Sequence, residues 1–392
     1  MTAAYIVAAA RTPIGRFRGQ LSSVRADHLG AHILTSLARR AKLAPETVED
    51  VIFGCVTQIG EQSANIARTA LLGAGWPYGI PGMTIDRKCG SGEAAVHIAA
   101  GLIAAGSADV IVAGGAESMS RVPMGSNRTI HGEALGWMVE DRFDIVNQGE
   151  AAERICDLYG LTRDDCDEYA IESHGRAAAA ADRGDFDAET AAVPVADLRE
   201  RDAEGEAPPP LTHDETIRRD TSREKLGTLK TSFRPYGGRI TAGNASQICD
   251  GASALLMMSE AATQRHGVTP RARIVATVAV GSDPELTLTG PIEATRRILA
   301  RTGLSIDDID IFEVNEAFAC VPIAWMRELG VGHDRLNVNG GAIALGHPLG
   351  ATGARLMTTL LHELERRGGR YGLQAICCNG GIGTATIIER LG

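Results

Sequence analysis

Short apolar runs alternate with alanine- and leucine-rich helical segments along most of the chain. Residues 4–9 predict a first strand, and residues 27–43 repeat apolar side chains at helical spacing. A strand at residues 49–58 follows, then a helix at 92–106 that is apolar around most of its circumference, then a strand at 108–120. This alternation is typical of α/β proteins, in which helices cover a sheet.

The last third of the chain repeats this order. Its hydrophobic pattern predicts a strand at residues 272–280, a helix at 291–303, a strand at 308–315 and a terminal strand at 384–390. Each half also carries a cysteine beside a glycine-rich turn. This is consistent with an internal duplication, which direct identity between the halves is too weak to prove.

Charge density rises between residues 121 and 239. Thr162 and Asp165 form a capping-box pattern that predicts a helix continuing to Ala181. The acidic, proline-rich stretch 200–210 indicates an exposed connection. We interpret this region as an insertion that covers the ligand site. The predicted domains are an N-terminal lobe, a loop domain and a C-terminal lobe: residues 1–120 with 243–270, residues 121–242, and residues 271–392.

Composition narrows the possible functions. The 392 residues suit two similar lobes or one large α/β unit, and 46 glycines suit tight turns and close backbone approach. A net charge of −10 argues against non-specific binding to nucleic acids or anionic membranes. No stretch approaches the roughly 18 apolar residues of a membrane span, and the first apolar run is too short for a signal peptide. The eight cysteines form no CxxC pair, which favours reduced thiols in the cytoplasm.

Cys89 lies in the segment DRKCGSGEAA, where an extended stretch meets the predicted buried helix. Free backbone N–H groups and the helix dipole at that junction lower a thiol pKa and offer an oxyanion contact. Arg87 and Lys88 add positive charge if they point toward the sulfur. Taken alone, a cysteine before GSG is more often a packing residue.

His347 and Cys377 favour the interpretation of Cys89 as a reactive thiol over that of a packing residue. His347 lies in a loop with five glycines between residues 340 and 353, where an imidazole can deprotonate a thiol and then stabilise an oxyanion. Cys377 would be useful where a proton must reach or leave carbon, with Cys378 as a packing thiol. Asn315 opens the motif NEAFA at a predicted helix start, where its amide could hold a water or cap the helix. Together these residues suit acyl transfer with carbon–carbon bond cleavage.

Six motifs in the same order resemble the thiolase family along essentially the whole chain. They are CGSG at Cys89, GGAESMS at Gly114, TAGNAS at Thr241, NEAFA at Asn315, GGAIALGHPLGATGAR at Gly340, and the C-terminal cysteine–glycine loop. The resemblance implies a duplicated five-layer α-β-α-β-α core with an inserted loop domain. It also implies dimers, often paired into tetramers, coenzyme A thioesters as substrates, and no metal or redox cofactor.

The resemblance further implies a role for each residue. Cys89 attacks the 3-keto carbon of a 3-oxoacyl-CoA with the help of His347, and Cys377 protonates the enolate of acetyl-CoA or takes its proton in the reverse Claisen condensation. Asn315 holds a water facing the thioester oxygen. The backbone N–H groups of Cys89 and Asn379 form a second oxyanion hole.

The expected contacts with coenzyme A lie in the loop domain and in the TAGNAS loop, and the expected acyl pocket lies in the loop domain and in NEAFA. Arg218 matches the family position that lies against the adenine of coenzyme A, and Ser246 matches the serine near its pantetheine. The basic residues that could meet the phosphates include Arg219, Arg223 and Lys225, and for the first two a solvated charged face is favoured. The acyl pocket is expected to include Gln148 and Phe318.

Gln148 replaces the methionine that closes a small acyl pocket in short-chain members of the family. The segments at residues 55–68 and 147–155 resemble actinobacterial thiolases that degrade bulky chains, including steroid side chains. We therefore predict a degradative 3-ketoacyl-CoA thiolase. The alternatives are a biosynthetic acetoacetyl-CoA thiolase, a 3-ketoacyl synthase-like condensing enzyme, against which Cys377 argues, and an acyl-CoA carrier without turnover.

Overall fold

The computed structural model describes residues 2–128 and 130–392, and in this part of the chain ten strands form one connected sheet. Nine strands follow the order β4-β3-β5-β6-β1-β7-β10-β9-β8, and β2 pairs with β6. The two halves of the sheet meet where β1 pairs with β7. The bounds are β1 Ala4–Arg11, β2 Gly15–Arg16, β3 Asp50–Gly54, β4 Gly82–Ile85, β5 Val110–Ser118, β6 Cys249–Ser259, β7 Ala272–Gly281, β8 Ile311–Val314, β9 Tyr371–Cys378 and β10 Ile382–Arg390.

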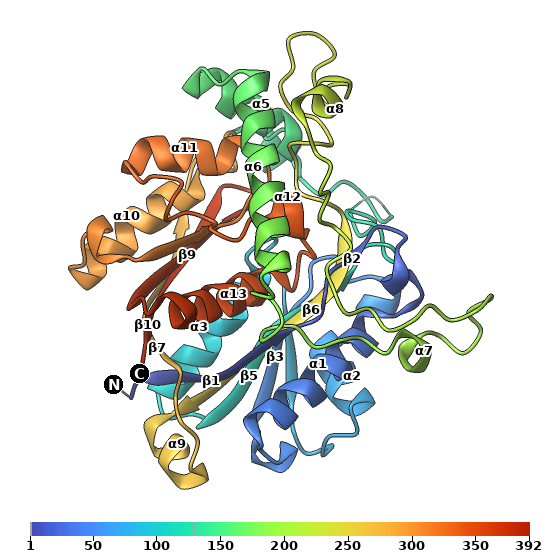
Figure 1. Cartoon of the computed structure of the whole chain (residues 1–392), viewed down its shortest axis with the longest axis vertical. Helices are drawn as coiled ribbons and strands as arrows, with labels where there is room; N and C mark the ends of the chain where they lie inside the picture. Colours follow the sequence, from blue (N-terminus) through green and yellow to red (C-terminus); the bar gives the residue numbers. More distant parts are fainter. Residues whose placement is uncertain (1, 129) are drawn as a thin grey trace.

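The helices of the two lobes lie in three layers around the half-sheets (Figure 1). The first outer layer packs on the N-terminal half-sheet, a central pair lies between the half-sheets, and the last layer packs on the C-terminal half-sheet. These layers are α1 Ala26–Ala41 with α2 Ile66–Gly73, α3 Ser91–Ala104 with α13 Thr352–Arg367, and α10 Gly290–Thr302 with α11 Cys320–Leu329. The predicted α-β-α-β-α arrangement is confirmed.

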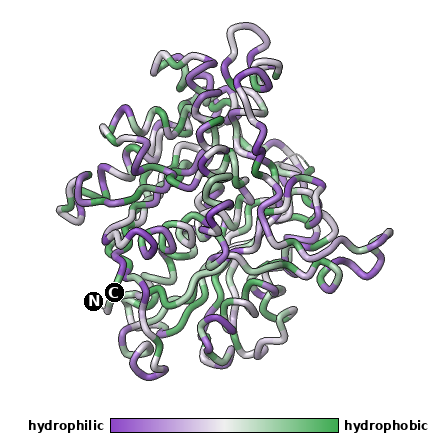
Figure 2. The backbone as a smooth tube through the Cα atoms, viewed as in Figure 1, coloured by the Kyte–Doolittle hydropathy of each residue, from purple (hydrophilic) through white to green (hydrophobic). Residues whose placement is uncertain are grey.

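Hydrophobic residues follow the central strands, and hydrophilic residues follow many of the outer loops (Figure 2). The predicted strands and helices listed above are found with shifts of a few residues at their ends, for example β1 and α3. The capping box is confirmed, because the Asp165 N–H donates to Thr162 Oγ1 at 3.1 Å and the Thr162 N–H donates to Asp165 Oδ2 at 2.7 Å. None of the helices formed by the described residues has the length and apolar character needed to cross a membrane.

Residues 121–242, which we call the covering segment, join β5 to the residues before β6. One of its helices packs on α11 and another on α12 (Ala342–Leu345), and both contribute to an apolar cluster that includes Phe318 and Cys377. The helices of the segment are α4 Trp137–Glu140, α5 Gln148–Tyr159, α6 Arg163–Asp182, α7 Val195–Leu198 and α8 Arg223–Gly227. The remaining helices of the lobes are α9 Glu260–His266 and α12 Ala342–Leu345.

Candidate active site

Close backbone packing between the N-termini of α3 and α13 brings the loops of Cys89 and His347 together. A Cβ atom added to Gly353 would lie 2.0 Å from the backbone nitrogen of Glu93. One added to Gly92 would lie 2.8 Å from a backbone oxygen of the α13 entry loop. Because no side chain fits at these points, the glycines in CGSG and GATGAR are required by the contact itself.

The Cys89 thiol is buried and surrounded by groups that favour its anion. It receives hydrogen bonds from the side chain of Gln148 and from the backbone N–H groups of Cys89 and Asn379, and the positive charge of Arg128 acts in the same direction. Burial is the larger effect, and it raises the Cys89 pKa to about 11. The thiol of the free protein is therefore protonated at neutral pH and needs a base to become a nucleophile.

The positive charge near Cys89 comes from a residue that the sequence did not single out. Lys88, a candidate for this role, instead pairs with Asp86 at 2.5 Å. Arg128 of the covering segment is the arginine whose charge acts on the thiol. Its neighbour Asn127 donates a hydrogen bond to the backbone oxygen of Val56 at 3.3 Å, which anchors this part of the segment. No local pattern signals this contact, because it joins residues far apart in the chain.

His347 is buried, and both of its ring nitrogens have neighbours. Nδ1 lies 2.6 Å from the hydroxyl oxygen of Thr352, which itself donates to the backbone oxygen of Pro348 at 2.9 Å. Nδ1 must therefore carry the proton, and Nε2 faces Asn315 Nδ2 at 3.4 Å with its lone pair free to accept. Burial, followed by the charge of Arg355, lowers the His347 pKa to about 3. The imidazole is neutral and can act as a base.

Asn315 lies in an extended link after β8, so the predicted helix start at NEAFA is wrong. The helix α11 begins only at Cys320, because tertiary contacts hold the preceding residues in place. The side chain of Glu316 accepts hydrogen bonds from Tyr169 and from the Ile343 N–H, both at 3.0 Å. Asn315 Oδ1 is buried and has no hydrogen-bond partner among the described residues, which suits the predicted water.

Cys377 and Cys378 are neighbours on β9 and belong to different apolar clusters. Cys377 lies with Phe318, whereas Cys378 lies with Cys89. A Cβ atom on Gly90 would lie 2.6 Å from the Cys378 sulfur, so this thiol packs under the N-terminus of α3. Burial, followed by the nearby Cys89, raises the Cys377 pKa well above its usual value. Cys377 is therefore a protonated thiol near Cys89.

Arg218 and Ser246, the expected coenzyme A contacts, lie next to the loops that carry His347 and Asn315. The exposed Arg218 reaches Gln247 Oε1 at 3.4 Å, and the backbone oxygen of Gln247 accepts the His347 N–H at 3.2 Å. The Ser246 N–H donates to the backbone oxygen of Ala317 at 3.0 Å. The two neighbouring arginines form ion pairs with acids of α6, at 2.8 Å for Arg219–Asp182 and 3.0 Å for Arg223–Asp164.

Phe318 and Gly149, the neighbour of Gln148, both contact a second aromatic ring, that of Phe233. The rings of Phe318 and Phe233 meet edge to face with centroids 6.1 Å apart. Phe233 also covers Gly149, where a Cβ atom would lie 2.1 Å from the ring. Gln148 is the first residue of α5, and its side chain reaches the Cys89 sulfur. Phe233 therefore links Phe318 to the N-terminus of α5, whose first residue contacts Cys89.

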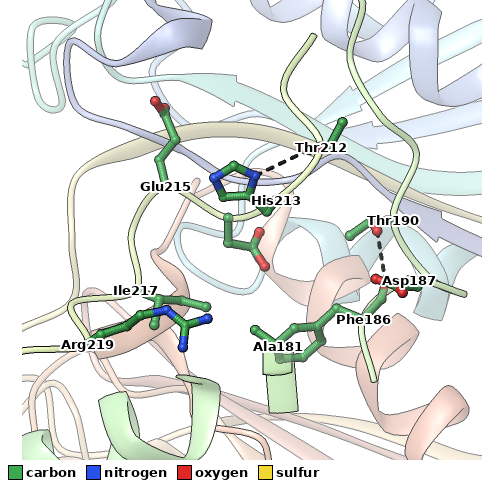
Figure 3. A pocket seen from close by; sticks show the side chains of 10 residues that line it. Ala181, Phe186, Asp187, Thr190, Thr212, His213, Glu215, Ile217 and Arg219 are labelled. Atoms are coloured by element: carbon green, nitrogen blue, oxygen red, sulfur yellow. Dashed lines mark hydrogen bonds between the residues drawn. The ribbon is translucent and has the colours of Figure 1, made fainter. Parts of the chain in front are cut away.

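A separate cavity of about 330 Å³ lies between the end of α6 and residues 212–219 (Figure 3). Its wall includes His213, Glu215 and Arg219, but none of the catalytic candidates. Asp214, also in the wall, accepts hydrogen bonds from Arg11 at 2.7 and 3.0 Å. Among residues 2–128 and 130–392, no group of three histidine, cysteine or acidic side chains is arranged to hold a metal ion.

Comparisons with known proteins match nearly the whole chain to thiolases. The family model described as "Thiolase, N-terminal domain" matches residues 4–261, and "Thiolase, C-terminal domain" matches residues 268–390. A steroid 3-ketoacyl-CoA thiolase of Mycobacterium tuberculosis is 46% identical over 401 residues, covering 100% of this chain and 95% of the relative. A 3-oxoadipyl-CoA/3-oxo-5,6-dehydrosuberyl-CoA thiolase of Escherichia coli is 45% identical over 408 residues, covering 100% of both. The crystal structure of the Bacillus anthracis acetyl-CoA acetyltransferase matches with a TM-score of 0.89 and 39% identity, covering 100% of this chain and 99% of that one.

Proposed function

The chain belongs to the thiolase family, and from this premise we propose how its residues cleave 3-oxoacyl-CoA into acetyl-CoA and a shortened acyl-CoA. The observation that carries the proposal is the pairing of a protonated thiol with a neutral imidazole. Cys89 has a pKa of about 11, and His347, whose Nε2 carries no proton, has a pKa of about 3. Neither group is charged before the substrate arrives, so proton transfer and attack occur together.

In the first half-reaction, the Cys89 proton passes to His347 Nε2, and the thiolate attacks the 3-keto carbon. The new oxyanion takes the backbone N–H groups of Cys89 and Asn379, which the sulfur uses in the free protein. The bond between the second and third carbons then breaks. The departing enolate oxygen accepts hydrogen bonds from protonated His347 and from the Asn315-held water, and the Cys377 thiol protonates the enolate carbon to give acetyl-CoA.

In the second half-reaction, coenzyme A gives its thiol proton to the Cys377 thiolate and attacks the acyl group on Cys89. The Cys89 thiolate leaves and recovers its proton from His347, so every residue returns to its starting state. Arg218 and Ser246 bind the coenzyme A that enters here as a substrate. This scheme needs no metal or redox cofactor.

We further propose a degradative role. Gln148 stands where short-chain members of the family have a methionine, and relatives named for steroid and 3-oxoadipyl substrates support acyl chains other than acetoacetyl. The resemblance to the family alone suggests a cytoplasmic homodimer or homotetramer. It also suggests the division into two lobes and a loop domain at residues 1–120 with 243–270, 121–242 and 271–392.

The roles of the two catalytic thiols are separable by experiment. We expect Cys89→Ala to abolish acyl-enzyme formation, with turnover lowered at least about 10⁴-fold. Cys377→Ala should still become acylated by activated thioesters but should lose exchange of the acetyl-CoA α-proton, measured by NMR in deuterated buffer. Cys378→Ala is the matched control, because that thiol packs under α3. Retained exchange in Cys377→Ala would remove its assigned role.

A further inference from the structure

We propose that Arg128 binds an acid group at the end of the acyl chain, so that the preferred substrates are 3-oxoacyl-CoA esters with a terminal carboxylate. The proposal rests on the proposed function, since it takes the acyl group to be carried by Cys89. It assigns to the covering segment a binding role for the acyl chain in addition to its expected contacts with coenzyme A.

Arg128 is held close to the nucleophile by the residue before it. Asn127 donates to the backbone oxygen of Val56 at 3.3 Å, and the side chain of Val56 belongs to the same apolar cluster as Cys89 and Met119. The positive charge of Arg128 lowers the pKa of the Cys89 thiol, which agrees with this placement. Asn127 therefore holds the chain at Arg128 beside the apolar cluster that contains Cys89.

The charge of Arg128 is available to a ligand. Other arginines of the covering segment bind carboxylates of the protein, including Arg154 with Asp144 and Arg234 with Glu150, both at 2.5 Å. Within residues 2–128 and 130–392, no acidic side chain forms an ion pair with Arg128. Its side chain is exposed in the free protein, so a carboxylate can reach it without first displacing a partner.

The surroundings of the nucleophile also suit a polar chain end. The side chain of Gln148 hydrogen-bonds to the Cys89 sulfur at the position where a methionine would give an apolar wall. A hydrocarbon end lying against an amide and a guanidinium would desolvate both without replacing their hydrogen bonds. A carboxylate restores them, because a guanidinium can donate two parallel hydrogen bonds to its oxygens.

The experiment compares two six-carbon 3-oxoacyl-CoA esters that differ only at the last carbon, which is a methyl group in one and a carboxylate in the other. The readout is the ratio of their kcat/KM values for thiolysis. We expect the wild-type protein to favour the carboxylate ester by roughly tenfold or more, the range of a hydrogen bond between charged groups. In Arg128→Gln the ratio should fall toward one, and Arg128→Lys should lie between.

Arg142→Gln is the matched control, because Arg142 is exposed on the same segment and donates to the backbone oxygen of Met138. It should keep the wild-type ratio. An equal ratio in the wild-type protein and Arg128→Gln would overturn the proposal while leaving the thiolase activity in place. Failure of the wild-type protein to cleave these two esters would overturn this inference, and failure on longer 3-oxoacyl-CoA esters as well would contradict the proposed function.

Discussion

The floor and the roof of the active site are built in opposite ways. The floor consists of the loops that carry Cys89 and His347, where two helix N-termini meet backbone to backbone through glycines. The roof is the covering segment, whose charged side chains pair with one another at the surface, as Arg223 does with Asp164. The floor has almost no freedom to adjust, whereas the roof can exchange one exposed contact for another.

The polar groups of the two regions also differ: those of the floor are buried and hydrogen-bonded to the backbone, whereas many of those of the roof are exposed ion pairs. In the floor, the buried carboxylate of Glu117 accepts the N–H groups of Val56 and Thr57 at 2.9 Å and of Gly350 at 2.8 Å, which ties both lobes together. Losing one such buried bond costs about 1–3 kcal/mol. Exposed ion pairs of the roof contribute about 0–1 kcal/mol each. We infer that the floor fixes the geometry of the chemical step and that the roof selects the substrate.

Gly353→Ala should have the largest effect, because it attacks the contact that defines the floor. The new methyl group would lie 2.0 Å from the Glu93 nitrogen and would force α3 and α13 apart. We expect the free energy of unfolding to fall by roughly 3 kcal/mol, the upper end of overpacking costs, with loss of most activity. Urea denaturation followed by a thiolysis assay measures both.

Gly101→Ala on α3, the helix that Gly353 of α13 packs against, provides the control. Its Cβ atom would have no neighbour within 4 Å, and the site is exposed. Alanine should therefore stabilise α3 by about 0.5–1 kcal/mol relative to glycine. If both variants unfolded at the same urea concentration as the wild-type protein, the floor would be less tightly packed than its contacts indicate.

The floor is also the region that the sequence predicts best. Cys89, His347 and Cys377 can be singled out in the sequence because each stands in or beside a glycine-rich turn that adjoins a strand or helix with a clear apolar pattern. These signals are local, and the tertiary structure follows them. The helix start expected at Asn315 failed for the opposite reason, since contacts from α6 and α12 hold that segment extended.

The sequence does not predict which residues of the covering segment approach Cys89. Arg128 lies in a stretch without a strong periodic pattern, and its approach to Cys89 depends on an anchor at Val56, far away in the chain. The basic residues Arg87 and Lys88 directly precede Cys89, and the sequence therefore favours them as the source of positive charge. A local turn directs Lys88 to Asp86 instead. Side-chain direction at such a turn depends on backbone geometry that composition and spacing do not specify.

Thr352→Val tests how strictly the floor orients its base. Valine keeps the shape of threonine but cannot accept the Nδ1–H of His347, so the proton can move to Nε2 and block proton uptake from Cys89. We expect kcat/KM to fall by roughly 10- to 100-fold. Thr352→Ser, which retains the hydroxyl, should stay within a few-fold of the wild-type protein. Equal activity of the valine and serine variants would show that Thr352 does not orient the imidazole.

The smallest effect is expected at Gln148, a side chain of the covering segment that hydrogen-bonds to the Cys89 sulfur. With a pKa of about 11, the Cys89 thiol of the free protein should react with iodoacetamide about ten times faster for each unit of pH between 7 and 10. Gln148→Leu removes a hydrogen bond to the thiolate, which raises the pKa further and should slow alkylation several-fold at any pH in this range. Cys89→Ala supplies the background from the other thiols. A rate that is already constant above pH 7 would mean that Cys89 and His347 form an ion pair before the substrate binds, and the floor would then activate its nucleophile without help from the roof.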